Sequence, residues 1–550
     1  MLNSETKQKI NALRDTLVGK IPTPTGQVEQ ITLALVYKYM GDIDIENEKL
    51  GGKLFFDNDF KKYSWKNLLN GKTSGTDRAK LYAEGLESMA LNPALPDLFK
   101  EIFKNAYIPF KDSETISMFL KQINEFNYNN SEDLGDAFEY LLSVMGSQGD
   151  AGQFRTPRHI IDFIVEIVEP QKDDRILDPA CGTAGFLISA YNYLVKNNKI
   201  TQVDRDNFTK NFVGYDISGD MVMLSRVNMY LHHFPNPQIF EYDSLTSEDK
   251  WKDKFETILA NPPFMTPKGG IKPHKKFGVQ ANRSEVLFVD YIMEHLTPDG
   301  KAGIIVPEGI IFQSANAYKE LRKMMVEDNY LWAVISLPSG VFQPYSGVKT
   351  SILLFDKEIA SKSKNILFAK VENDGFDLGA QRRENQKSEL PEAIEDLKEY
   401  KRFILNGEIS SRNNITKVIN LISSSEENAS ASMNNISLVS KSSIKDSQYN
   451  LSSERYRISS SISNQKWPLV SLEEICDVRD GTHDSPKYQL EGLPLITSKN
   501  IINNKIDFSN VNYISKTDLE FINKRSLVET GDIIMPMIGT IGNPIIVEKT

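Results

Sequence analysis

Apolar residues near the start of the chain recur at the spacing of a helix. Between residues 131 and 145 they are Leu134, Phe138, Leu141, Leu142 and Met145. Positions three, four and seven apart share one helix face, and Ser131, which precedes two acidic residues, is a typical N-cap. We therefore expect residues 1–150 to form a helical N-terminal domain that ends in a flexible break over 146–152.

From residue 175 onward the pattern changes to short apolar runs separated by longer amphipathic segments. This alternation is typical of a parallel sheet whose strands are joined by crossover helices. The expected strands span 175–177, 212–215, 257–260, 302–306, 331–336 and 351–355. The pattern predicts one α/β domain, which we place at residues 151–370.

A change in composition follows this domain. Between residues 423 and 463 Ser, Asn and Ala dominate and large apolar residues are few. Such a stretch buries too little surface to offset its ordering entropy. We interpret 371–465 as a helical extension and a Ser/Asn-rich linker, with an ordered patch near 449–456. A new globular pattern begins at Trp467, so we assign 466–550 to a further domain.

The tetrapeptide Asn261, Pro262, Pro263, Phe264 directly follows the apolar run 255–260. Prolines lack an N–H and fix φ, so they end a strand abruptly, and the carboxyl ends of strands are where doubly wound sheets bind ligands. The Asn261 side chain and the Pro262 carbonyl can accept two hydrogen bonds from an exocyclic amino group, and Phe264 offers a face to a flat ring. The loop suits an aminopurine, although an Asn-Pro pair alone also marks ordinary turns.

A second candidate loop joins an apolar strand to an apolar helix through small residues. It contains Asp178, Gly182, Thr183, Ala184, Gly185 and Phe186. Small residues let a ligand approach the backbone, and the helix start presents free N–H groups. A dinucleotide-binding turn has three glycines and an acid about 20 residues later. Here there are two glycines, and the next strand-ending acid, Asp216, lies 38 residues after Asp178, so NAD is disfavoured.

Acidic residues follow the next two apolar segments as well. Asp216 suits the paired hydroxyls of a ribose, and Asp243 could accept a hydrogen bond from an adenine amino group. Each alone is more often a solvated carboxylate at a strand end. The order Asp178, Asp216, Asp243 and Asn261 at successive strand ends favours one nucleoside-containing cofactor beside one amino-bearing substrate.

Composition narrows the class of protein further. The net charge of −10 argues against a small, wholly basic nucleic-acid binder, although a local basic surface remains compatible with DNA contact. The two cysteines, Cys181 and Cys476, lie in different predicted domains, so we expect neither a disulfide framework nor a metal site. No long uncharged apolar stretch or signal-peptide core is present, so we expect a cytoplasmic protein without membrane contact.

Taken together, these motifs resemble those of the modification (M) subunit of type I restriction-modification systems, an amino-methylating DNA methyltransferase family. The family's Q-F/Y-x-T-P stretch resembles Gln153, Phe154, Arg155, Thr156, Pro157 and Arg158. The resemblance implies a Rossmann-like fold that binds S-adenosylmethionine, with residues 153–158 at its methionine end, the 178–186 turn and Asp216 around it, and Asn261 to Phe264 as the catalytic tetrapeptide. Two positions depart from the family pattern: Arg155 stands where an aromatic residue is common, and Ala184 where a glycine is common.

The resemblance also implies the substrate and partners. The target would be an adenine flipped out of double-stranded DNA and stacked on Phe264. Adenine is favoured over cytosine because cytosine-N4 enzymes more often carry Ser or Asp at the first position of the tetrapeptide. Specificity and restriction subunits, or a second methyltransferase copy, are the expected partners.

A basic loop follows the tetrapeptide. Its cations are Lys268, Lys272, Lys275 and Lys276, with His274 among them. Contact with DNA phosphates and a solvated surface loop are both open interpretations of this loop.

The last part of the chain resembles a different module. Residues 467–482 are similar to the opening of a target-recognition domain of type I specificity (S) subunits, and residues 531–542 to a later stretch of it. The alternative is an unrelated small β-rich module. If the resemblance holds, modification and recognition are fused here, and we expect this partial α+β domain to continue beyond Thr550.

Two other functions stay open. Similar Asn-Pro-Pro loops serve enzymes that methylate a protein glutamine or an RNA base amino group. A sheet that only assembles a restriction complex or recognises DNA would be an inactive scaffold, which would require a damaged site, whereas residues 261–264 are intact.

Overall fold

The computed structural model describes most of the chain. The described residues are 4–126, 135, 137–142, 156–264, 271–343, 346–379, 381–407, 431–433, 435–456, 470, 472–479, 481, 486–502, 505–536 and 544–548. They fall into two compact units, residues 1–458 and 459–550. Gln153, Phe154, Arg155 and Lys268 lie outside the described residues, as do Ser131, Leu134 and the expected break at 146–152.

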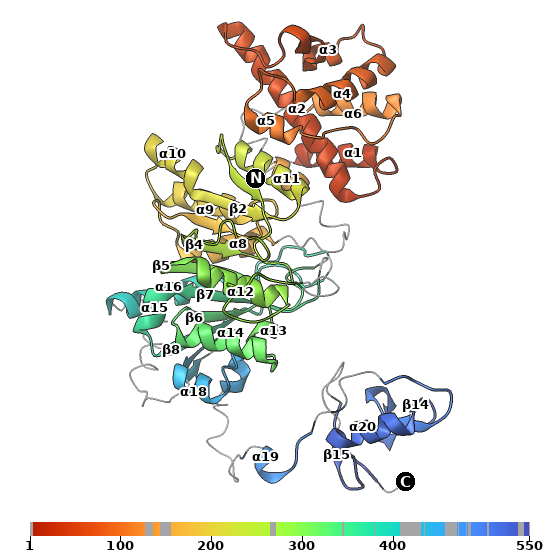
Figure 1. The fold of residues 1–550 in the computed structure, drawn as a ribbon, viewed down its shortest axis with the longest axis vertical. Coiled ribbons are helices and arrows are strands. Elements are labelled where there is room, and N and C mark those ends of the chain that lie inside the picture. Colours follow the sequence, from red (N-terminus) through yellow and green to blue (C-terminus); the bar gives the residue numbers. More distant parts are fainter. Residues whose placement is uncertain are drawn as a thin grey trace. The chain divides into compact units, whose positions relative to one another are not determined.

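The chain begins with helices, as predicted (Figure 1). They are α1 (Ser4–Leu17), α2 (Pro24–Leu50), η1 (Asn58–Tyr63), α3 (Trp65–Leu68), α4 (Gly75–Met89), α5 (Asp97–Ile102) and α6 (Ser113–Asn124). Helix α2 begins with Pro24 after the N-cap Thr23 and ends at Gly51 in the left-handed conformation, which suits a residue without a Cβ. Phe138, Leu141 and Leu142 of the predicted amphipathic helix are buried in the same core.

Ten strands form the central sheet of the first unit. They are β1 (Ile176–Asp178), β2 (Phe212–Asp216), β3 (Gln238–Glu241), β4 (Phe255–Ala260), β5 (Leu296–Pro307), β6 (Leu331–Ser336), β7 (Thr350–Asp356), β8 (Asn365–Lys370), β9 (Ala431–Met433) and β10 (Ile436–Ser440). Their order is β3-β2-β1-β4-β5-β7-β6-β8-β10-β9. Strands β3, β2, β1, β4 and β5 pair in parallel.

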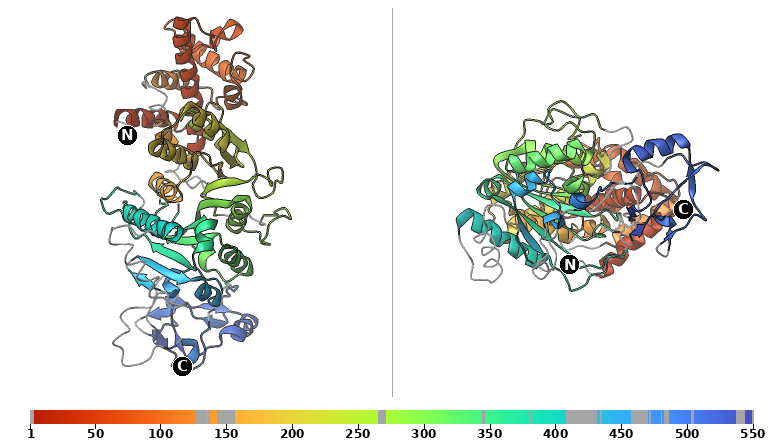
Figure 2. Two further views of the ribbon diagram at one scale, coloured as in Figure 1. Left: turned by 90° about the vertical axis from the view of Figure 1, so that its left-hand side faces the viewer. Right: turned by 90° about the horizontal axis from the view of Figure 1, so that it is seen from below.

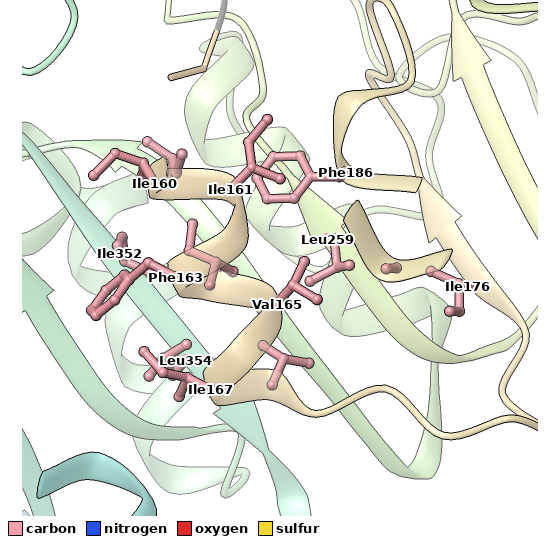
Figure 3. Packing of buried hydrophobic residues seen from close by; sticks show 14 of the residues in the cluster. Ile160, Ile161, Phe163, Val165, Ile167, Ile176, Phe186, Leu259, Ile352 and Leu354 are labelled. Carbon is pink, nitrogen blue, oxygen red and sulfur yellow. The ribbon is translucent and has the colours of Figure 1, made fainter. Parts of the chain in front are cut away.

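Helices cover both faces of this sheet, as Figures 1 and 2 show. They are α8 (Arg158–Val168), α9 (Gly185–Asn197), α10 (Gln202–Asn211), α11 (Gly219–Leu231), α12 (Ser284–His295), α13 (Gly309–Phe312), α14 (Asn316–Glu327), α15 (Lys357–Lys362) and α16 (Leu390–Asn406). Helices α8 and α9 share one buried cluster, and α12 and α14 share another. Figure 3 shows Ile161 and Val165 of α8 among Phe186 and Leu259, so α8 is packed against the start of α9 and against β4.

The fold class is confirmed: a central, mostly parallel sheet in an α/β layer arrangement with a helical N-terminus. The six predicted strands are present, and β6 has the predicted bounds. The sheet was predicted to be parallel, and some strands depart from this: β7 runs antiparallel to β5 and β6, and β10 runs antiparallel to β8 and β9. Strands β3 and β8 were missed: β3 has only four residues, and the apolar centre of β8 lies between polar ends.

The linker interpretation of 423–463 was wrong for part of that stretch. Strand β10 pairs with β8, and its Leu438 and Val439 are buried in the two cores of the sheet. The ordered patch expected near 449–456 is present, because the buried Arg322 of α14 donates from Nε to the carbonyl of Tyr449 at 2.7 Å. This bond anchors the chain beyond α18 (Lys441–Asp446) and before η3 (Ser453–Tyr456). Two apolar residues between serines suffice for a strand when an open sheet edge receives them.

The second unit contains short elements. They are α19 (Leu472–Ile475), β11 (Leu493–Leu495), η5 (Ser498–Asn500), β12 (Ile501–Ile502), β13 (Lys505–Ile506), β14 (Asn512–Ile514), α20 (Lys516–Ser526), β15 (Ile533–Ile534) and β16 (Ile545–Ile546). The strands pair antiparallel as β11 with β14, β12 with β13 and β15 with β16. Across the described parts of both units, no helix combines the length and apolarity needed to cross a membrane.

Candidate active site

The strand order reverses at β1, which pairs with β2 on one side and with β4 on the other. Asp178 ends β1, Asp216 ends β2 and Asn261 follows β4. Ligands of doubly wound sheets bind outside the carboxyl ends of the strands at such a reversal. The structure therefore brings these three predicted residues to neighbouring positions on one edge.

Asp216 holds the small-residue turn after β1. Its Oδ2 accepts a hydrogen bond from the Gly182 backbone N–H at 3.0 Å, and its Oδ1 accepts one from the Ser218 N–H at 2.9 Å. Burial raises the pKa of Asp216, and these two N–H donors oppose that rise. The Ile217 N–H is a third donor to this carboxylate, which leaves acceptor capacity for a ribose hydroxyl, since a carboxylate has about four lone-pair sites.

Glycine at position 182 leaves space above the turn. Its φ is +52°, a conformation that side chains rarely adopt, and a Cβ built there would meet no heavy atom within 4 Å. The turn is fixed from below, since Ser225 Oγ donates to the Gly182 carbonyl at 2.5 Å and Asn228 Nδ2 to the Thr183 carbonyl at 2.8 Å. A rigid backbone with an open face is what a close-lying ligand requires.

Asp178 is buried beside this turn. Burial raises its pKa to about 8; the Ala180 N–H, which donates to Oδ1 at 3.1 Å, opposes the rise, and the neighbouring Asp216 adds to it. At neutral pH the Asp178 carboxyl group is therefore mainly protonated in the absence of a cation. A positively charged ligand on this edge would favour its ionised form.

Ala184 adopts φ +64° where the family commonly has glycine. Its side chain is nevertheless buried in the core of the sheet, so a methyl group fits here despite the left-handed backbone. The next residue cannot carry a Cβ as easily, because one built on Gly185 would approach Ile161 Cδ1 to 3.0 Å. Gly185 thus allows α8 and α9 to approach each other closely.

Asp243 caps its own turn. Its Oδ1 accepts from the Leu245 N–H at 3.0 Å and the Thr246 N–H at 3.3 Å, and its Oδ2 accepts from the Thr246 hydroxyl. These hydrogen bonds within the protein account for a carboxylate after β3, with no need for a bound ligand. A role toward an adenine amino group stays a prediction.

The catalytic candidate Asn261 is held from one side. Its Nδ2 donates to Thr156 Oγ1 at 2.8 Å. Its Oδ1 is buried and has no hydrogen-bond partner among the described residues. An unpaired buried acceptor is destabilising by about 1–3 kcal/mol, and a ligand that donates to it would remove that penalty.

The rest of the tetrapeptide is also fixed. Ser284, at the start of α12, donates from Oγ to the Pro263 carbonyl at 3.1 Å. Phe264 is half-buried against the core and lies edge-on to Phe342, with ring centroids 6.3 Å apart. Ser284 was missed because a serine at a helix start normally indicates only a cap.

Arg158, for which cofactor binding stays a prediction, makes two bonds within the protein. Its guanidinium pairs with Glu139 and donates to the Gly185 carbonyl at 3.1 Å. It therefore links the first turn of α8 to the helical N-terminal part and to the start of α9. The sequence motif did not indicate these two partners, which only the fold brings to Arg158.

The basic loop after the tetrapeptide is partly described. Lys272, Lys275 and Lys276 are exposed, and Lys276 pairs with Glu248 at 3.0 Å. His274 differs from them, because its ring lies edge-on to Trp251 at 4.2 Å and burial lowers its pKa. His274 is an anchor of the loop within an aromatic cluster and was wrongly grouped with its cations.

Sequence reasoning missed Ile217, which directly follows Asp216. Its side chain is 70% exposed, although large aliphatic residues are normally buried. An apolar residue after a strand-ending acid was the available signal. The Ile217 side chain, directly after Asp216, suits an apolar wall of a binding site for a flat ring.

These features fit the adenosyl group of S-adenosylmethionine. Asp216 has acceptor capacity for a ribose, Gly182 leaves open space, and Ile217 offers an exposed apolar surface beside them. The amide of Asn261 stands on the neighbouring strand end, at a separate position suited to a donor substrate.

The sheet order β3-β2-β1-β4-β5-β7-β6, with β7 antiparallel to its neighbours, carries a small-residue turn after β1 and an Asn-Pro-Pro loop after β4. The solved structure of the type I restriction-modification system methyltransferase subunit from Streptococcus thermophilus has the same fold, with a TM-score of 0.63 and 17% identity. The alignment covers 83% of this chain and 100% of that one.

The sequence profile of the N-6 DNA Methylase family matches residues 129–465, more than half of the chain, and the chain belongs to this family. The type I restriction enzyme EcoEI methylase subunit of Escherichia coli is 31% identical over 264 residues, which cover 47% of this chain and 54% of that protein. The MpnII methylase subunit of Mycoplasma pneumoniae is 25% identical over 491 residues, 78% of this chain and 81% of that protein. The chain spans about half the length of several curated relatives that it matches, EcoEI among them.

Proposed function

We propose that this chain is the modification subunit of a type I-like restriction-modification system and methylates adenine N6 in DNA. Family membership and the similarity to type I methylase subunits support this class of activity. The observation that carries the proposal is the Asn261 amide, whose Oδ1 is buried without a partner among the described residues at the carboxyl end of β4.

The chemistry requires two acceptors for one amino group. The lone pair of adenine N6 is delocalised into the ring, so the amine is a poor nucleophile. Asn261 Oδ1 and the Pro262 carbonyl would draw the two amino hydrogens out of conjugation and aim the lone pair at the methyl group. The N–CH₃ bond forms as the S–CH₃ bond breaks, and the amine then loses a proton to water. Positioning and electrostatics supply the rate, so no strong base is needed beforehand.

Bound S-adenosylmethionine would supply the electrophilic methyl group. In the proposal, Asp216 accepts from its ribose, Gly182 and Thr183 border it, and Ile217 covers its adenine. Residues 153–158 would lie at its methionine end, where Thr156 accepts a hydrogen bond from Asn261. Phe264 would stack on a flipped adenine, which a duplex otherwise hides from the enzyme.

Methyl transfer measured on separate polymers tests the proposal. The full chain, a supplied specificity subunit and tritiated S-adenosylmethionine are incubated with DNA, RNA or cell protein, and labelled nucleosides are identified. We expect label on N6 of adenine in DNA. Asn261→Ala should lower kcat about 10²- to 10³-fold, the loss typical when one preorganised hydrogen-bonding group is removed from an active site.

A matched control is Asn236→Ala. Asn236 is an exposed residue that also precedes a proline, but it lies before β3 and away from the carboxyl edge, so this variant should retain wild-type activity. Label in the RNA or protein fraction would favour the other methyltransferase functions. DNA binding without label would favour an inactive scaffold, and absence of DNA labelling by the wild-type chain would refute the proposal.

We further propose the surrounding assembly. The exposed Lys272, Lys275 and Lys276 are candidates for contact with DNA phosphates, and Lys268 remains a prediction from the sequence. Specificity and restriction subunits, or a second methyltransferase copy, are the proposed partners, and the cytoplasm is the proposed location.

The division into domains is part of the same proposal. Residues 459–550 form a separate compact unit of one helix of three turns and short strand pairs. We assign to it the beginning of a target-recognition domain, on the sequence resemblance at 467–482 and 531–542. Deletion of 459–550 should abolish sequence-specific DNA binding while cofactor binding to the remaining chain persists, which calorimetry with S-adenosylhomocysteine would measure.

A further inference from the structure

We infer that Thr156 is a positioning residue that couples cofactor binding to recognition of the target amino group. Its one hydroxyl proton, once donated to an anionic group of the cofactor, leaves only acceptor lone pairs facing Asn261. Asn261 must then present its NH₂ to Thr156 and its carbonyl oxygen to the base. This inference rests on the proposed function and adds a connection between the two halves of the site.

The geometry begins with the contact between the two side chains. Asn261 Nδ2 lies 2.8 Å from Thr156 Oγ1, and Asn261 Oδ1 points elsewhere, buried and without a partner among the described residues. This orientation is the productive one, because an amino group needs an acceptor. The reverse orientation would present NH₂ to the substrate's NH₂, two donors facing each other.

A hydroxyl alone does not choose between these orientations. Thr156 can accept from Asn261 Nδ2 or, with the amide flipped, donate to Asn261 Oδ1, since a threonine hydroxyl is both donor and acceptor. Only one orientation of the Asn261 amide remains when the Thr156 hydroxyl donates its proton to another group, because the hydroxyl can then only accept from Asn261. The methionine end of the proposed cofactor carries a carboxylate, which only accepts, so it can take that proton.

The backbone holds Thr156 in place for this role. Pro157 follows it, which favours an extended conformation at Thr156, and α8 begins at Arg158. Arg158 bonds the Gly185 carbonyl at 3.1 Å, and Gly185 begins α9 directly after the small-residue turn. Thr156 is thus fixed between the turn proposed to bind the cofactor and the loop that carries Asn261.

A consequence follows from linkage. If cofactor binding selects the productive Asn261 orientation, binding of a target adenine must in turn strengthen cofactor binding by the same factor. The coupling should depend on the 6-amino group of the base, on the Thr156 hydroxyl and on the cofactor's carboxylate. Removal of any one should abolish it.

The test measures DNA binding rather than catalysis. Duplexes contain either adenine or unsubstituted purine, which lacks the 6-amino group, at the methylated position identified in the labelling experiment. The affinity of the full chain with its specificity subunit is measured with and without S-adenosylhomocysteine. We expect the preference for adenine over purine to rise at least about fivefold when S-adenosylhomocysteine is present, as for a coupling of about 1 kcal/mol.

Three comparisons isolate the hydroxyl. Thr156→Val, which keeps the shape and removes the hydroxyl, should lose the rise in preference and lower kcat, while Thr156→Ser should retain the rise. The decarboxylated analogue of S-adenosylhomocysteine should produce no rise with the wild type. Thr209→Val removes a hydroxyl that bonds only within α10, to the Arg205 carbonyl, and serves as the matched control.

The outcomes separate this inference from the proposed function. If the wild type methylates DNA but Thr156→Val keeps the rise, or if the decarboxylated analogue produces it equally, Thr156 does not couple the two sites. A wild type without any rise also overturns the inference while leaving methylation intact. Failure of the wild type to methylate DNA is instead failure of the proposed function.

Discussion

The two halves of the carboxyl edge satisfy their polar groups in different ways. On the side of β1 and β2, the carboxylates of Asp216 and Asp178 accept hydrogen bonds from the backbone of their own turns. On the side of β4, the Asn261 amide is held through Nδ2 while its Oδ1 has no partner among the described residues. Folding thus supplies donors to both carboxyl groups of the first half, whereas the Asn261 oxygen receives none from the described residues. A site that must hold one molecule and discriminate another benefits from both arrangements.

In the half of the carboxyl edge formed by β1 and β2, where the cofactor is proposed to bind, the largest effect is expected from Asp216→Ala. The substitution removes a ribose acceptor and leaves the Gly182 and Ser218 N–H groups without their acceptor. With charged hydrogen bonds contributing about 1.5–3 kcal/mol, the Kd for S-adenosylhomocysteine should rise about 10- to 100-fold, measured by calorimetry. Asp220→Ala, an exposed acid in the first turn of α11, is the matched control. An unchanged Kd would place the ribose elsewhere.

Phe264→Ala should affect DNA binding at the half of the carboxyl edge beside β4. The ring lies edge-on to Phe342 and is partly exposed, and its exposed part is the surface proposed to stack on a flipped base. Base stacking on an aromatic side chain contributes about 1–3 kcal/mol, which predicts that KM for DNA rises about 5- to 100-fold with little change in Kd for the cofactor. Phe264→Trp keeps a stacking surface and should retain binding. A loss of cofactor affinity in Phe264→Ala would show that the halves are not separate.

The third prediction concerns the pH dependence of stability and Asp178. Its folded-state pKa of about 8 lies above the value of about 3.9 for an unfolded chain. The folded state therefore holds a proton that the unfolded state loses, and stability falls as pH rises from about 4 to 8, by up to about 1.4 kcal/mol per pH unit. Asp178→Asn, which stays neutral, should lose this component. Urea unfolding at pH 5 and pH 7.5 measures it, and a parallel pH dependence in both proteins would contradict the assignment.

The sequence alone predicted which polar residues lie at the carboxyl edge of the sheet, because each motif that marks them acts over only a few residues. Two prolines after Ala260 end β4 regardless of what surrounds them, and the small-residue turn after Asp178 permits a close backbone approach. Strand ends in a parallel sheet meet at one edge, so linear order alone placed Asp178, Asp216 and Asn261 together. The role of each residue remains a proposal that the substitutions above test.

Other features depended on partners distant in the chain. Arg158 bonds Glu139 and Gly185, and His274 packs on Trp251, which no local pattern announces. Strand β10 exists because the edge of β8 accepts it, although its serine-rich surroundings predicted a linker.

By itself the sequence determined which residue types reach the carboxyl edge, because proline, glycine and apolar periodicity act over a few residues. Only the tertiary structure decided which polar atoms are already paired, because hydrogen bonds join residues as far apart as Thr156 and Asn261. That pairing leaves the Asn261 amide oxygen buried without a partner among the described residues, at the carboxyl end of β4, and the proposed recognition of an amino group depends on this atom.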